Sequence, residues 1–311
     1  MVRTKNDSSR RVMMLFAAAL LIVPLFAAQA AAVKRSKSDR DISAIGRRDI
    51  VHGDERKFIT STEKERQLGA QQLAAIEHSV KLITDPAIAK YLSELAEKIG
   101  RNSDAQMSIS VVIVDSNSID TCTSPGGYQY ITRGLLVHAE SEGELASVLA
   151  HGVAQTALHL PTRQQVRQAL MAVFTPMQST IPVSSCTSLS SLSLSSGVRR
   201  TDAFDADYFA VQYLYKSGYD PDCYLRFVQH TWPVGPKIVT FSDFPPTHER
   251  LNTLRREIAD ILPPQTQSVV STSAFEEFQL HLRDLPPLPP EPDRPVLIRR
   301  RSNEIDVISP L

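Results

Sequence analysis

A long helical pattern near the middle of the chain determines how the segments around it can pack. Apolar side chains recur about every fourth position from Leu145 to Leu160, which places them on one face of a helix. Ser141 and Glu144 form a capping signal at its start. The carboxylates of Glu140, Glu142 and Glu144 are interpreted as partners of the helix dipole. This pattern predicts a helix with one buried face, and a buried face requires other elements to cover it.

The segments around this helix predict more helices and one short run of strands. Capping signals and apolar spacing predict helices at 62–82, 85–99, 204–218, from 220 onward, and at 249–262. The first of these starts at a capping pair formed by Thr62 and Glu65, and the first two are expected to pack as a hairpin. Residues 107–114 and 128–132 are rich in β-branched and aromatic side chains and predict two strands. The expected fold class is α+β, mainly helical, with a small sheet beside helix 144–160.

Both ends of the chain have non-globular composition. Basic residues precede the apolar run from Val12 to Ala27, and small residues follow it, which predicts a signal peptide at 1–32 cleaved near Ala30 to Ala32. An uncleaved anchor and a twin-arginine signal are the alternatives. Leu285 to Pro295 reads LPPLPPEPDRP, which is typical of an extended spacer.

These features divide the chain into four parts. They are a signal peptide at 1–32, an N-terminal extension at 33–57, a folded domain at 58–262 and a Pro-rich tail at 263–311. Within the domain, nine of the twenty residues at 178–197 are serine, which predicts an irregular insert. We therefore expect an exported protein, either periplasmic or secreted.

Charge and cysteine content narrow the classes of function. The 34 basic and 34 acidic residues balance, so we expect no nucleic-acid partner, because phosphate binding needs a basic excess. Peripheral membrane contact is compatible with this balance. The cysteines Cys122, Cys186 and Cys223 are too few for a disulfide framework and are interpreted as inert thiols, with a pairing of Cys186 and Cys223 left open.

Several segments together resemble one family of peptidases. They are STEKERQLGAQQLA from Ser61, VDSNSIDTCTSPGGYQYITRGLL from Val114, ELASVLAHGVAQTALHL from Glu144, DAFDADYFAVQYLYKSGYDP from Asp202 and PPTHERL from Pro245. In this order they resemble the zinc metallopeptidase family of HtpX, BepA and the CaaX prenyl proteases. The resemblance implies a zincin-like domain in which helix 144–160 carries an HExxH motif, with two zinc ligands and a glutamate that acts as general base.

The residues that this chemistry requires are mostly replaced. The pentad reads His151-Gly152-Val153-Ala154-Gln155, so the first ligand is present, while glycine stands at the base position and glutamine at the second ligand position. By resemblance, Ala203 stands at the third ligand position, and Asp207 matches an aspartate that orients the site. Phe244 stands where the family tends to have histidine. One imidazole and an amide cannot hold and activate a zinc-bound water, so we expect no catalytic residue and no intact metal site.

Four other residues are candidate substitute ligands. His159 lies eight residues beyond His151, about 12 Å along a helix, and is too far away. Asp205 and Asp202 are turned about 200° and 100° from position 203. A site built from His151, His248 and an aspartate is the remaining alternative. Without a metal, we expect His151 to be satisfied by hydrogen bonds, with Asp207 as the candidate partner.

The resemblance also implies that an extended peptide lies along a strand edge of the cleft. That strand follows the turn Pro125-Gly126-Gly127, which makes Gly126, Gly127, Tyr128 and Tyr130 the candidate peptide-binding residues. The leading hypothesis is an inactive pseudopeptidase that binds unfolded or extended polypeptide in envelope protein quality control or assembly. Its cofactor is none, or zinc if the family activity is retained. The alternatives are an active zinc endopeptidase with an atypical site and a purely structural paralogue.

Overall fold

The computed structural model describes residues 36–78, 80–174, 200–231, 247–287, 296–299 and 305–308. The predicted leader, the Ser-rich insert and Phe244 lie outside these residues. The chain divides into two units at Lys37, and the first unit contains only two described residues. The second unit, Ser38–Leu311, contains all the other described residues.

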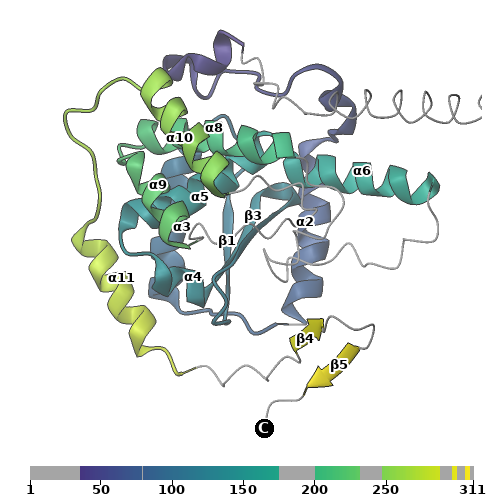
Figure 1. Cartoon of the computed structure of the whole chain (residues 1–311), viewed down its shortest axis with the longest axis vertical. Helices are drawn as coiled ribbons and strands as arrows, with labels where there is room; N and C mark the ends of the chain where they lie inside the picture. Colours follow the sequence, from purple (N-terminus) through teal and green to yellow (C-terminus); the bar gives the residue numbers. More distant parts are fainter. Residues whose placement is uncertain are drawn as a thin grey trace, which may run out of the picture. The chain divides into compact units, whose positions relative to one another are not determined.

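Helix α5, Glu142–Ala157, lies at the centre of the fold (Figure 1). It begins as predicted, because the Ser141 hydroxyl accepts a hydrogen bond from the Glu144 N–H at 3.3 Å. It packs against α3 (Pro86–Arg101), α8 (Arg200–Lys216) and α9 (Asp222–Thr231). The expectation of a single buried face is wrong, because nearly every residue of α5 is buried.

A three-stranded sheet covers another side of α5. The strands are β1 (Ser110–Val114), β2 (Thr121–Ser124) and β3 (Tyr128–Thr132), in the order β1-β3-β2. Strand β3 pairs in parallel with β1 and antiparallel with β2. The mainly helical α+β class is therefore confirmed, although the sequence reading missed β2.

The strand order corrects the predicted position of the peptide-binding edge. Strand β3 is central, so its main-chain groups pair on both sides and are not available to an added strand. Gly126 and Gly127 are buried in the preceding turn and have φ values of 78° and 83°, which favour glycine. Tyr130 is also buried. The edge on this side of the sheet is β2.

Helices α2 and α3 do not form the predicted hairpin. Helix α2, Thr62–Glu77, packs against the turn Pro125–Gly127, whereas α3 packs against α5 and β1. The two helices lie on opposite sides of the sheet in Figure 1. The capping residue of α2 is Ser61 and not Thr62, because the Ser61 hydroxyl accepts from the Lys64 N–H at 3.3 Å. The start of α3 at Asp85 and Pro86 is confirmed.

Residues before position 58 belong to the folded domain. Short 3-10 helices at Ser38–Arg40, Ile42–Ala44 and Gly53–Phe58 carry them across its surface. Arg48 is buried and forms an ion pair with the buried Asp104 at 2.5 Å. The Tyr213 hydroxyl donates to the same carboxylate at 2.9 Å.

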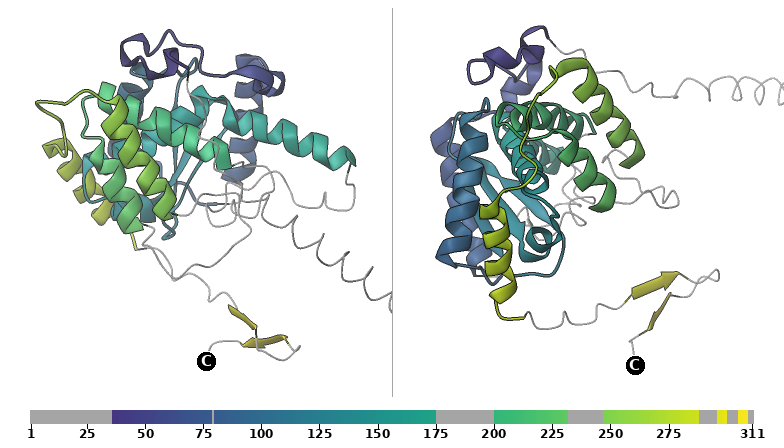
Figure 2. Two further views of the ribbon diagram at one scale, coloured as in Figure 1. Left: turned by 45° about the horizontal axis from the view of Figure 1, so that its top comes forward. Right: turned by 90° about the vertical axis from the view of Figure 1, so that its left-hand side faces the viewer.

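Residues after position 262 also fold, in contrast to the predicted tail. Helix α10, Thr247–Ile261, is followed by α11, Ser273–Asp284. Phe275, Phe278 and Leu282 of α11 are buried, and Phe278 stacks on Tyr91 with 4.5 Å between the ring centroids. In the right-hand view of Figure 2, the blue helix α3 and the green helices α9 and α10 lie on opposite sides of the domain.

Three smaller features complete the described fold. Helix α4 spans Arg133–His138, and helix α6 spans Leu160–Phe174. Strands β4 (Val296–Arg299) and β5 (Ile305–Ile308) form an antiparallel pair. Within the described ranges, no helix has both the length and the apolar character needed to cross a membrane.

Candidate functional site

His151 lies in the second half of α5 and faces two neighbouring helices. Its Nδ1 atom lies 2.7 Å from the Tyr224 hydroxyl on α9 and 3.1 Å from Asp207 Oδ1 on α8. The predicted partner, Asp207, is therefore confirmed, and Tyr224 is an additional one. Because both neighbours can accept, the network assigns the proton to Nδ1. The Nε2 lone pair is then available, and the side chain is 15% exposed.

Asp207 is held by a second group that the sequence reading missed. Arg250, on α10, donates to the two carboxylate oxygens at 2.5 and 2.7 Å, and its Nη2 also donates to the Tyr224 hydroxyl at 2.8 Å. Burial alone would raise the pKa of Asp207. The charge of Arg250 and the hydrogen bonds from His151 and Arg250 outweigh burial and hold that pKa well below its usual range.

Tyr224 stays protonated in this setting, because burial raises the pKa of its hydroxyl. It therefore donates to Asp207 at 2.5 Å. The only sequence signal for Arg250 was its place in the PPTHERL segment, and Tyr224 had none, because contacts between distant helices are not visible in the sequence.

Gly152 creates a space that another side chain fills. A Cβ atom at position 152 would overlap with the amide group of Gln129, which projects from β3. Gln129 is 1% exposed, and its Nε2 donates to the carbonyl of Val148 at 3.0 Å. An amide from the sheet thus fills the space beside position 152, which the resemblance assigns to the general base.

A sequence model of the family described as Peptidase family M48 matches residues 83–258, which is more than half of the chain. The chain belongs to peptidase family M48. The zinc metallopeptidase resemblance and the fold class that it implied are confirmed.

The relatives are named for a role in assembly. A putative beta-barrel assembly-enhancing protease of Vibrio cholerae is 26% identical over 180 residues, which is 53% of this chain and 37% of that protein. Beta-barrel assembly-enhancing proteases of Yersinia pestis and Escherichia coli K12 are 23% and 21% identical over 184 residues, 54% of this chain and 38% of theirs. The match thus spans less than two fifths of the relatives' own length.

The residues at the positions that the resemblance assigns to zinc do not fit a catalytic zinc ion. The His151–Asp207 pair is the arrangement that orients a metal-binding imidazole. However, Ala203 has no donor atom and is 4% exposed, and Gly152 has no carboxylate. Gln155, half-buried on the same helix, offers only an amide. A tetrahedral catalytic site requires three protein ligands, and these positions supply one imidazole.

The substitute ligands considered from sequence are not assembled around His151. Asp202 forms an ion pair with Arg167 at 2.5 Å. His159 faces the buried Glu65 at 2.9 Å, and His248 is exposed on α10. Asp205 is half-buried and has partners of its own.

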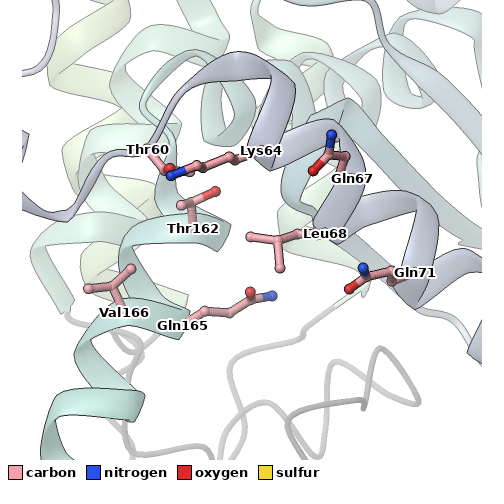
Figure 3. A pocket seen from close by; sticks show the side chains of 8 residues that line it. All are labelled: Thr60, Lys64, Gln67, Leu68, Gln71, Thr162, Gln165 and Val166. Atoms are coloured by element: carbon pink, nitrogen blue, oxygen red, sulfur yellow. The ribbon is translucent and has the colours of Figure 1, made fainter.

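A groove lies between α2 and α6, near the edge of the sheet. Figure 3 shows Lys64, Gln67, Leu68 and Gln71 on α2 facing Thr162, Gln165 and Val166 on α6. The groove between them has a volume of about 420 Å³. The same helices border β2, since the Ser124 hydroxyl hydrogen bonds to Gln72 of α2, and α6 contacts β2. Two apolar side chains and three glutamine amides line the groove, which suits contact with the main chain of a bound peptide.

The outer edge of β2 offers backbone groups. Thr132 N–H donates to Asp120 carbonyl, and hydrogen-bonded pairs alternate in an antiparallel ladder. The register then places the N–H and C=O groups of Thr121 and Thr123 on the side away from β3. Within the described ranges, no strand pairs with that side.

The cysteine interpretation changes in part. Cys122, in β2, is disulfide-bonded, contrary to the expectation of inert thiols. Cys223 is a free, fully buried thiol whose pKa is raised to about 11 by burial, so it is inert as expected. Cys186 lies outside the described residues.

Proposed function

We propose that this chain is an exported, catalytically inactive M48 protein that binds extended polypeptide along the edge of β2. The observation that carries the loss of catalysis is the amide of Gln129 in the space of the general base. Ala203 at the third ligand position supports it. The names of the relatives, which refer to beta-barrel assembly, favour a role in protein assembly.

We infer the loss of catalysis from the number of metal ligands and carboxylates that the chain supplies at the family's catalytic positions. M48 chemistry needs a metal-bound water and a carboxylate to take its proton. At these positions the chain supplies the His151 imidazole, oriented by Asp207 and Tyr224, and no carboxylate at position 152. The remaining role of the cleft is to hold a polypeptide without cutting it.

The binding mode follows from the sheet edge and the groove. Backbone groups of Thr121 and Thr123 would pair with an extended peptide, as in β-augmentation. The amide side chains of Gln67, Gln71 and Gln165 would hydrogen bond to peptide main chain in the neighbouring groove. Neither contact depends on the sequence of the peptide, which suits a protein that meets unfolded chains.

A proline at position 123 tests the binding mode. Thr123→Pro removes an outward N–H donor and leaves the pairing between β2 and β3 in place. Loss of one hydrogen bond costs about 0.5–1.5 kcal/mol, which weakens binding of an unfolded-protein peptide roughly 2- to 12-fold. Thr123→Ala keeps the donor and should bind like the parent. The measurement is fluorescence anisotropy of a labelled peptide, with circular dichroism as the check on folding.

Two results would contradict the proposal in different ways. Absence of any affinity of the parent chain for extended peptides would exclude the binding function. Chelator-sensitive hydrolysis of casein that is lost in His151→Ala would instead support an active zinc endopeptidase.

A further inference from the structure

A second group of potential metal ligands lies at the other end of α5. Glu140 precedes the helix, Glu144 lies in its first turn, and His230 projects from α9. One side-chain donor atom from each of the three lies within 4.8 Å of the others. His230 Nε2 is 2.9 Å from Glu144 Oε2. None of these residues belongs to the M48 zinc positions.

His138 fixes the orientation of the His230 ring. His138, the last residue of α4, has its Nε2 atom 3.0 Å from His230 Nδ1 and 3.2 Å from the Thr231 hydroxyl. If Thr231 and His230 both donate to His138, His230 Nε2 carries a lone pair that faces a carboxylate. A divalent cation would be held between that lone pair and the carboxylate, in place of the proton that His230 Nε2 and Glu144 Oε2 share in their hydrogen bond. A metal-binding histidine commonly donates its other ring N–H to such a neighbour.

Charge and access favour a cation at this place. Glu144 is 2% exposed, and in the described part of the chain neither it nor Glu140 forms an ion pair with lysine or arginine. Glu140 is exposed and His230 partly so, which leaves an open approach from solvent. One imidazole and two carboxylates with room for water match the donors that Zn²⁺ and Co²⁺ accept.

We propose that Glu140, Glu144 and His230 bind one divalent transition-metal ion, with His138 as the residue that positions His230. This site is separate from the M48 zinc position, because Glu144 and His151 are about 10 Å apart along α5. A bound ion would join the loop that follows α4, the start of α5 and the end of α9.

Cobalt titration of the full chain tests this site. We expect one Co²⁺ per chain with visible absorption bands, displaced by Zn²⁺. Glu140→Gln should weaken binding at least about tenfold, and His138→Gln about 10- to 100-fold. Glu140 is exposed, so its substitution carries little risk to folding. His151→Ala is the matched control and should bind as the parent does.

The control variants decide between the two sites. Unchanged affinity in both Glu140→Gln and His230→Ala, with folding confirmed by circular dichroism, would overturn the proposal. Loss of the ion in His151→Ala alone would place it at the M48 position. Absence of Co²⁺ and Zn²⁺ binding to the parent at micromolar concentration would also overturn it.

Discussion

Glycine at position 152 removes a carboxylate and also admits Gln129, so the two residues should be energetically coupled. In the parent, Gly152→Ala displaces the buried Gln129 amide and should cost about 1–3 kcal/mol by overpacking. In a Gln129→Ala background the same change should stabilise by about 1 kcal/mol, because alanine favours a helix more than glycine does. Urea unfolding of the four proteins measures this. Additivity of the two changes within about 0.5 kcal/mol would contradict the coupling.

The same residue explains why restoring the motif is harder than the sequence suggests. The substitutions Gly152→Glu, Gln155→His and Ala203→Glu restore the residue types of the two ligands and the base in the sequence. The glutamate would still enter the space that the Gln129 amide occupies. A restoration experiment therefore needs Gln129 shortened as a fourth change.

At the scale of elements, helix α11 is an integral part of the core. Phe278→Ala should cost about 3–5 kcal/mol of unfolding free energy, because the ring is 3% exposed and stacks on Tyr91. Leu280→Ala on the same helix is the matched control. Leu280 is 57% exposed, so this change should stay within about 0.5 kcal/mol. Denaturant unfolding compares them, and equal costs would show that α11 does not contribute as described.

The sequence predicted elements best where a cap and an apolar repeat coincide. Helix α5 has both, in Ser141 and the repeat from Leu145, and α3 has Asp85 with Pro86. Helix α11 has similar signals, with Thr272 as its cap and Phe275, Phe278 and Leu282 on one face. Its place between prolines led to the wrong assignment as a tail. Strand β2 has polar residues and only four positions, which gives no alternation to read.

The sequence predicted which chemical groups the candidate site contains or lacks, but not which distant residues contact one another there. By resemblance, the sequence shows glycine at the base position 152 and no suitable ligand at positions 155 and 203, and it also shows the partner Asp207. Arg250 and Tyr224 come from distant helices, and no local pattern marks them as partners of Asp207. The resemblance pointed to β3 as the strand edge, whereas the long-range pairing of the three strands, which no local pattern reveals, places β2 at the edge.

At the scale of the whole molecule, we expect the folding unit to be wider than residues 58–262. A chain limited to residues 36–287 should unfold cooperatively near the temperature of the full chain. A chain limited to 58–262 should not, because it loses α11 and leaves Asp104 buried without Arg48. Removing one partner of such a pair costs about 3–5 kcal/mol. Calorimetry of both chains measures the difference, and a cooperative transition of the shorter chain at the same temperature would contradict it.

The burial of α5 on nearly all sides has a consequence for how such proteins are recognised. Packing constrains each of its positions from a neighbouring helix or strand, so the helix can discard its reactive groups and still be restricted to small and apolar residues elsewhere. A family match that includes this helix therefore shows that the surrounding core is packed in the same way. Whether a given member hydrolyses anything has to be read from the few donor positions alone.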